Sequence, residues 1–173
     1  MRHISKAEAL ERVERLAANM DSRYGGCALC ARLAETLSFR CVLNENEHAV
    51  AMLDQFAARP GHLVVVLRRH VEKIADLSWP EYAGIQRLAW EGARALEKAR
   101  SPARIFMAAL GSKRPIGVSF PHHHVHVIPL ASGDARDRPA EVLTWQMGVW
   151  TFDEGEEQRV AEELRRVWAL PLE

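Results

Sequence analysis

The segment 121–129 narrows the range of folds that this chain can adopt. It reads Pro-His-His-His-Val-His-Val-Ile-Pro, and positions 122 to 126 hold four of the chain's eight histidines. Histidines that alternate with valines predict a β-strand, on which His122, His124 and His126 share one face while His123 points to the other. Three imidazoles in a row can bind a metal, or they can supply a nucleophile with neighbours that orient it and stabilise charge. A surface cluster of histidines without function is the alternative interpretation.

Helix-start and turn signals around this strand predict an α+β domain. Ser5 and Ser78 each stand three residues before a glutamate, which is the capping-box pattern of a helix start. The helix after Ser78 is expected to run to residue 99, and another helix is expected at 156–168. Strand-like segments are found at 39–43, 48–53, 62–67, 105–110 and 122–130. The expected architecture is a five-stranded antiparallel sheet with a long helix and extra N- and C-terminal helices.

The composition excludes several classes of function. The chain has 173 residues, about the length of one domain, and 48% of them are hydrophobic. Lysine plus arginine and aspartate plus glutamate both number 23, so no net charge attracts nucleic acid or an acidic membrane. No apolar run approaches the ~20 residues of a membrane span, and the N-terminus lacks the pattern of a signal peptide. We therefore expect a cytoplasmic protein with neither nucleic-acid nor membrane partners.

The cysteines point to metal or redox chemistry. Cys27 and Cys30 form a Cys-x-x-Cys motif, whereas Cys41 stands alone. In a reducing compartment such a pair is more often a metal half-site or a redox motif than a structural disulfide. The residues alone leave these interpretations open. Cys41 is expected to pack as a small apolar side chain.

The histidine-rich strand resembles the signature of the histidine-triad (HIT) superfamily of nucleotide hydrolases and transferases, in which three histidines alternate with apolar residues. Upstream, Glu47-His-Ala-Val-Ala-Met-Leu-Asp54 and Pro60-Gly-His-Leu-Val-Val-Val-Leu-Arg-Arg-His70 look like the hairpin and third strand of HIT domains. The resemblance covers roughly residues 27 to 130. It implies a HIT-like fold with its core at 27–132, an N-terminal helical extension at 1–26, and a C-terminal tail with a helix at 133–173.

The resemblance implies that the alternating histidines are catalytic. His124 matches the family nucleophile, which attacks the α-phosphate of a nucleotide and forms a covalent nucleotidyl-histidine. Water then releases a nucleoside monophosphate. His126 matches the histidine that donates to phosphate oxygens, and His122 matches the first position of the triad. The implied substrates are dinucleoside polyphosphates or nucleoside phosphoramidates, and a histidine at position 126 favours hydrolysis over transfer.

The resemblance also implies a set of substrate-binding residues and a homodimer. Asp54 matches the aspartate that binds the ribose hydroxyls, and Ser119 matches a serine that contacts the phosphate. Gly117 belongs to the same phosphate-binding segment, and His62 matches a supporting histidine beside the triad. In the family, paired domains share a continuous sheet, so a homodimer is expected here.

Many bacterial HIT domains carry a structural zinc ion, and its ligand positions are matched here. They correspond to Cys27, Cys30, His70 and His122. Two thiolates and two imidazoles make a closed tetrahedral site, which is the structural rather than the catalytic arrangement. The implied cofactor is therefore a structural zinc ion.

Three alternatives remain open. His123, Val118 and the loop 111–116 depart from the family pattern, which motivates a zinc-stabilised nucleotide-binding module with little turnover. A nucleotidyltransferase or phosphorylase is the second alternative. The third is a catalytic zinc site built from the three alternating histidines, although that site would lack a nearby carboxylate base and would leave the cysteine pair unexplained.

Overall fold

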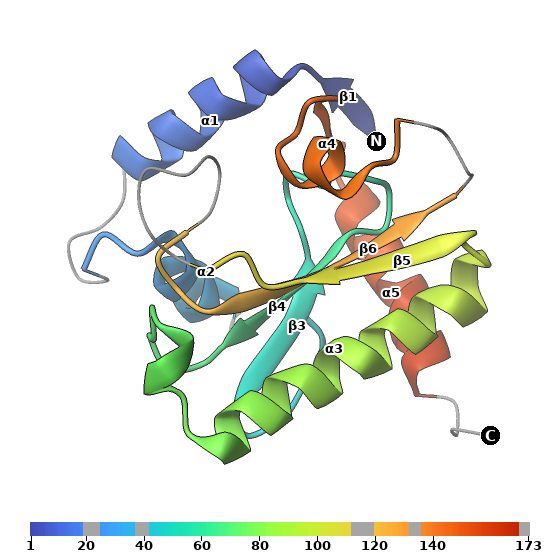
Figure 1. The fold of residues 1–173 in the computed structure, drawn as a ribbon. Helices are drawn as coiled ribbons and strands as arrows, with labels where there is room; N and C mark the ends of the chain where they lie inside the picture. The colour runs from blue at the N-terminus through green and yellow to red at the C-terminus, as the bar shows by residue number, and fades with distance from the viewer. Residues whose placement is uncertain (19–24, 37–41, 112–119, 132–135, 170–173) are drawn as a thin grey trace.

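An antiparallel sheet of five strands forms the centre of the computed structural model, which describes residues 1–18, 25–36, 42–111, 120–131 and 136–169 (Figure 1). The strands are β2 (Val42–Glu45), β3 (Ala49–Leu53), β4 (Leu63–Leu67), β5 (Arg104–Ala108) and β6 (His124–Leu130). Their order across the sheet is β2-β3-β4-β6-β5, and each neighbouring pair is antiparallel. The predicted α+β fold with a five-stranded antiparallel sheet is confirmed, and the histidine-rich strand lies between β4 and β5.

Helices cover both faces of this sheet, so β3 and β4 are buried along their whole length. They are α1 (Lys6–Ala18), α2 (Ala28–Thr36), α3 (Trp79–Arg100), α4 (Pro139–Leu143) and α5 (Glu156–Trp168), with a short 3-10 helix at Ile74–Asp76. The long helix α3 and the last helix α5 pack against the face that carries Val65 and Val125. On the opposite face, α2 packs against Val64 and Val66, while α1 and α4 pack near Ile128. Because side chains alternate along a strand, each face has its own hydrophobic cluster.

Local signals in the sequence explain the ends of the helices. Ser78 Oγ accepts a hydrogen bond from the Glu81 amide, and the Glu81 carboxylate accepts one from the Ser78 amide, so the predicted capping box is present. The helix α3 ends at Arg100 and is capped by Ser101, which has a left-handed φ of 44°. Within α3, Gly92 allows α5 to come close, because an added Cβ would lie 3.0 Å from the Trp168 ring. No described helix has both the length and the hydropathy that a membrane crossing requires.

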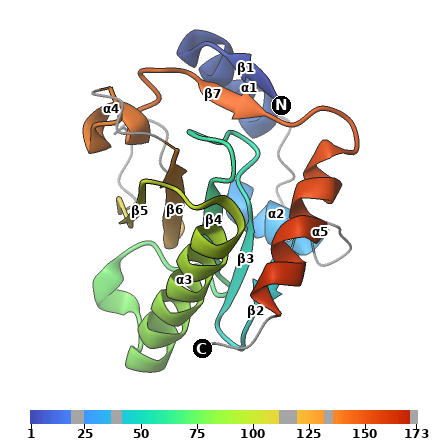
Figure 2. The same ribbon diagram turned by 90° about the vertical axis from the view of Figure 1, so that its right-hand side faces the viewer.

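A second, two-stranded sheet is not predicted by the sequence. It pairs β1 (Arg2–Ile4) with β7 (Val149–Thr151), and we call it the terminal sheet. Gly148 permits this pairing, because its φ is +75° and an added Cβ would overlap the Ile4 carbonyl oxygen. The terminal sheet also contacts the loop between β3 and β4, where Ala57 and Trp150 exchange two backbone hydrogen bonds of 2.9 and 2.7 Å. Figure 2 shows β7 lying beside that loop.

Candidate active site and metal centre

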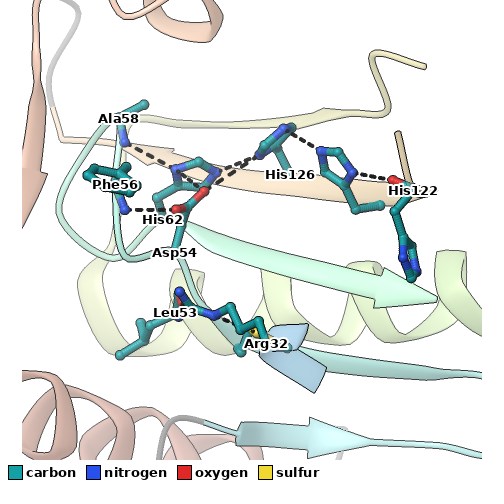
Figure 3. Close-up of polar contacts among 10 residues, drawn as sticks. Arg32, Leu53, Asp54, Phe56, Ala58, His62, His122 and His126 are labelled. Carbon is teal, nitrogen blue, oxygen red and sulfur yellow. Dashed lines mark hydrogen bonds and ion pairs between the residues drawn. The ribbon is translucent and has the colours of Figure 1, made fainter. Parts of the chain in front are cut away.

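Three histidines and one aspartate come together where β3, β4 and β6 lie side by side (Figure 3). The register of β6 against β4 places His124 and His126 opposite Val66 and Val64, on the same face of the sheet. Asp54 follows β3 and His62 precedes β4, and the Asp54 amide donates to the His62 carbonyl at 3.0 Å. Four predicted site residues from distant parts of the sequence, namely Asp54, His62, His124 and His126, are therefore neighbours.

Backbone groups at both ends of the histidine row fix where the ring hydrogens lie. The Ala58 amide is 3.1 Å from His62 Nδ1, and since an amide can only donate, Nδ1 accepts and the hydrogen of the neutral ring is on Nε2. His62 Nε2 lies 3.0 Å from His126 Nδ1, so it donates there and the His126 hydrogen is on Nε2. At the other end, His124 Nδ1 lies 2.6 Å from the His122 carbonyl oxygen, which can only accept. The His124 hydrogen is therefore on Nδ1.

The direction of the central hydrogen bond, between His126 and His124, follows from these hydrogen positions. His126 Nε2 lies 3.2 Å from His124 Nε2, so the His126 ring donates and the His124 ring accepts. All four hydrogen bonds point in one direction, from Ala58 to His122, with each ring neutral and carrying one hydrogen. We call the row His62–His126–His124 the histidine chain. Its chemical result is a nitrogen lone pair on His124 Nε2 with an N–H donor directly beside it.

Burial keeps the histidine chain neutral. His124 is 5% exposed, and burial, reinforced by the neighbouring His126 ring, lowers the pKa of His124 to about 4. Burial and the His62 ring likewise lower the pKa of His126 to about 4, although Asp54 acts in the opposite direction. Burial also lowers the pKa of His62. The rings are thus uncharged at pH 7, as the directions of their hydrogen bonds require.

Asp54 presents a carboxylate to the side of the histidine chain. Its Oδ1 accepts a hydrogen bond of 2.9 Å from the Phe56 amide, which orients the side chain. Its Oδ2 lies 3.6 Å from His62 Nδ1 and 4.0 Å from His126 Nδ1, beyond hydrogen-bonding range. The carboxylate therefore keeps free acceptor capacity next to the rings.

Arg32 on α2 is a site residue that the sequence analysis missed. Its guanidinium donates to the Leu53 carbonyl at 2.9 Å (Figure 3). It also donates to Gln55 Oε1 at 2.6 Å, so it contacts the residues on both sides of Asp54. No motif marks an arginine for such a contact. The only local signal is its position two residues after Cys30, on the helix that also carries the cysteines.

A second cluster contains the four residues that the resemblance assigns to zinc. The ligand atoms of Cys27, Cys30, His70 and His122 all lie within 4.8 Å of one another. His122 Nδ1 is 3.5 Å from Cys27 Sγ and 3.4 Å from Cys30 Sγ, and His70 Nδ1 is 3.4 Å from Cys30 Sγ. Zinc bonds of about 2.3 Å to sulfur and about 2.0 Å to nitrogen at tetrahedral angles would separate these atoms by about 3.5 Å. The four residues therefore fit a tetrahedral metal ion.

The surroundings of this cluster also suit a cation. His122 Nε2 donates to the Leu67 carbonyl at 2.6 Å, which leaves the Nδ1 lone pair facing the sulfur atoms. His70 Nε2 lies 3.6 Å from the Glu72 carboxylate. Burial and the neighbouring Cys27 raise the pKa of the Cys30 thiol to about 12, so two thiolates here need a cation to balance their charge.

The orientation of His122 contradicts the hypothesis of a catalytic zinc bound by three histidines. His122 precedes β6, and its ring faces the cysteines, whereas His124 and His126 face each other. Among the described residues, none of the groups that could hold a metal combines these three histidines. His123, at the position where the resemblance expects an apolar residue, is buried, and burial lowers its pKa.

Some predicted residues lie outside the described residues. These are Gly117 and Ser119, which the resemblance assigns to the phosphate, together with Val118 and Cys41. The remaining predicted residues form the two clusters described above. His122 belongs to both, since its ring lies in the cysteine–histidine cluster and its carbonyl accepts from His124.

Comparisons with known proteins agree with this arrangement. A family model described as the HIT domain matches residues 39–133. The chain is 32% identical over 88 residues to a 16.1 kDa HIT-like protein of Mycoplasma pneumoniae, a match to 50% of this chain and 60% of that protein. It is 34% identical over 86 residues to an AP-4-A phosphorylase of Mycobacterium tuberculosis, which covers 49% of this chain and 44% of the relative. The matches thus span about half of the lengths of these curated relatives.

Solved structures share the fold. A zinc-bound histidine triad family protein from Mycobacterium smegmatis superposes with a TM-score of 0.62 at 20% identity, over 83% of this chain and 93% of the other. A histidine triad protein from Bradyrhizobium japonicum gives a TM-score of 0.59 at 26% identity, over 81% and 96% of the two chains. The helix–sheet arrangement of this chain is therefore one already known from experiment.

Proposed function

The chain belongs to the HIT-domain family, and from that premise we propose that it is a nucleotide phosphohydrolase. Its substrates would be dinucleoside polyphosphates or nucleoside phosphoramidates, cut at the α-phosphate. The observation that carries the proposal is the 3.2 Å contact between His124 Nε2 and His126 Nε2, in which the hydrogen-bond directions leave the lone pair on His124. A neutral imidazole attacks without first losing a proton, and its burial keeps it neutral at pH 7.

In the proposed reaction, His124 Nε2 attacks the α-phosphorus and the bond from phosphorus to the leaving group breaks. His126 Nε2–H now donates a hydrogen bond to the oxygen or nitrogen that leaves, in place of His124, and stabilises the negative charge that develops there, while the proton that this group takes up comes from solvent. A water molecule then attacks the phosphorus, loses a proton to solvent and breaks the phosphorus–nitrogen bond. The products are a nucleoside monophosphate and the free leaving group, and the histidine chain regains its starting state.

The other assigned residues would hold the nucleotide. Asp54 keeps acceptor capacity on Oδ2, which suits the two hydroxyls of a ribose. His62 would hold His126 in place through their 3.0 Å hydrogen bond. Ser119 and Gly117 would contact the phosphate. His122 would orient the nucleophile through its backbone carbonyl.

Zinc is the cofactor that we propose for the cysteine–histidine cluster. Two sulfur and two nitrogen ligands leave no open coordination position, so the ion would be structural. It would hold α2, through Cys27 and Cys30, against the segments that carry His70 and His122. Free thiols suit a reducing compartment, which agrees with a cytoplasmic location.

A phosphorylase is the second candidate, because the relative from Mycobacterium tuberculosis carries that name. In that reaction inorganic phosphate, rather than water, would attack the nucleotidyl-histidine. The two reactions share His124 and differ only in the second acceptor. Products from a dinucleoside polyphosphate with and without added phosphate would distinguish them.

A homodimer is also part of the proposal. Strand β5 lies at the edge of the sheet, and Met107 on it is 43% exposed. An unpaired edge strand with an exposed apolar side chain is suited to pair with another chain. A second copy pairing there would extend the sheet.

The test is release of AMP from an adenosine phosphoramidate and from a diadenosine polyphosphate. The wild type should turn over at least one of them, and protein denatured at alkaline pH, where a phosphorus–nitrogen bond to histidine survives, should carry AMP on His124. His124→Ala should abolish both product and adduct while circular dichroism remains unchanged. Equal turnover by folded His124→Ala would refute the proposal, and nucleotide binding without any turnover by the wild type would favour a binding module.

A further inference from the structure

The loop between Asp54 and His62 contains a backbone contact that no family match assigns. The Ala58 amide donates to His62 Nδ1 at 3.1 Å and thereby sets which nitrogen of that ring carries its hydrogen. The preceding residue, Ala57, exchanges both of its backbone hydrogen bonds with Trp150 on β7. The loop is therefore attached to the terminal sheet at the residue next to the one that contacts the histidine chain.

We propose that the terminal sheet is a positioning element that fixes the hydrogen positions along the histidine chain, by holding the Ala58 amide against His62. This inference rests on the proposed function for its catalytic consequence. The terminal sheet lies outside the residues that match the HIT-domain model, since β1 and β7 fall before residue 39 and after residue 133. It would thus act on the matched core from outside it.

Because Asp54 lies beside His62, the Ala58 amide is needed to keep the hydrogen of the His62 ring on Nε2. Asp54 Oδ2 lies 3.6 Å from the same His62 Nδ1 that accepts from Ala58. If the amide moved away, His62 would be free to place its hydrogen on Nδ1 and turn it toward the carboxylate. A carboxylate is a stronger acceptor than water, so this second arrangement is favoured as soon as the amide is lost.

A change at His62 would pass along the whole histidine chain. With its hydrogen on Nδ1, His62 Nε2 becomes an acceptor, and His126 must then place its own hydrogen on Nδ1 to meet it. His126 Nε2 would face His124 Nε2 with a lone pair instead of an N–H. The nucleophile would lose its partner, and no donor would remain for the group that leaves.

Gly148 offers a perturbation of the terminal sheet far from the histidines. Its φ is +75°, and a Cβ there would overlap the Ile4 carbonyl oxygen, so Gly148→Ala must separate β1 from the end of β7. Gly155→Ala is the matched control, because Gly155 also has a positive φ of +70° but a Cβ there would meet only Arg159 Nη1, at 3.6 Å. His3→Ala is a milder variant, since it removes the His3 hydrogen bond to the Met147 carbonyl and the ring contact with Trp150.

The measurement is nuclear magnetic resonance of the zinc-loaded 173-residue chain with ¹⁵N-labelled histidine and backbone. In the wild type, long-range ¹H–¹⁵N correlations should show the hydrogen of His62 and of His126 on Nε2. A scalar coupling across the hydrogen bond should connect the Ala58 amide nitrogen with His62 Nδ1. In Gly148→Ala that coupling should weaken or vanish and a form with the hydrogen on Nδ1 should appear, with a partial effect in His3→Ala and none in Gly155→Ala.

Kinetics with the phosphoramidate provide the second readout. Gly148→Ala should lower kcat about tenfold or more with a smaller change in KM, because the donor is misplaced rather than the nucleotide site removed. A wild-type His62 with its hydrogen on Nδ1 would overturn the inference, as would unchanged ring signals in a folded Gly148→Ala whose β1 and β7 amides have shifted. The ring signals do not require turnover, so absence of turnover in the wild type would count against the proposed function and leave the positioning role to be decided by the spectra.

Discussion

The neutral histidine chain should make the stability of the fold depend on pH, and replacing His126 with glutamine isolates its share. In the folded protein, burial and the His62 ring lower the pKa of His126 to about 4, against 6.5 for a free ring. Between these values the unfolded chain binds a proton that the folded chain does not, so the free energy of unfolding falls as pH decreases from 6.5 toward 4. The other groups facing this ring are His124 and Asp54.

The size of the effect follows from the two pKa values. Between pH 7 and pH 5 the protonation of His126 in the unfolded chain should lower the free energy of unfolding by about 2 kcal/mol. The unfolded chain of His126→Gln has no ring at this position to take up that proton. Its free energy of unfolding should therefore fall less than that of the wild type between pH 7 and pH 5, by about the same 2 kcal/mol. Urea unfolding at pH 7, 6 and 5, with zinc in excess for both proteins, measures the difference directly.

Comparing the wild type with His126→Gln removes effects that are common to both, such as acid-dependent release of zinc. His48→Gln, at a partly exposed histidine outside the site, is the matched control for replacing a histidine by glutamine. The reasoning about burial would be refuted if wild type and His126→Gln lost the same free energy of unfolding between pH 7 and pH 5.

Three further predictions concern the metal, the support of the site and the edge of the sheet. Cys30→Ser should reduce bound zinc from one ion to none per chain by atomic emission and lower the melting temperature; retention of a full equivalent of zinc would contradict the proposed ligand set. Arg32→Met should lower the free energy of unfolding by about 2 kcal/mol in urea because it leaves the Leu53 carbonyl without its charged donor, whereas the exposed Arg87→Met should cost less than about 0.5 kcal/mol. Met107→Lys should shift the sedimentation coefficient from dimer to monomer if β5 pairs with a second chain, and an unchanged dimer would exclude that edge.

The sequence predicts most of the sheet and its helices because their signals are local. Valine and histidine alternate along β6, and the capping box at Ser78 is visible in four consecutive residues. The last helix has the predicted bounds Glu156–Trp168. The predicted strand at 122–130 is shorter in the structure, since His122 lies before β6 and turns its ring to the cysteines.

The terminal sheet and the supports of the site could not be predicted in this way. Strands of three residues show no periodicity, and β1 depends on a partner almost 150 positions away. The contact at Ala58 uses an amide that every residue except proline has, so its side chain carries no signal. Arg32 is one of many arginines on helices, and only the fold brings its guanidinium to the carbonyl before Asp54.

The ring and the backbone carbonyl of His122 have different roles, and a substitution changes the ring but not the carbonyl. The ring, which faces the cysteines, depends on the identity of the side chain, whereas the carbonyl that accepts from His124 Nδ1 is present in any amino acid. A substitution at this position can therefore delete the proposed metal ligand and still supply the acceptor that orients the proposed nucleophile. In evolutionary terms, a chain of this kind could exchange a metal for ordinary hydrophobic packing without rebuilding the histidine chain.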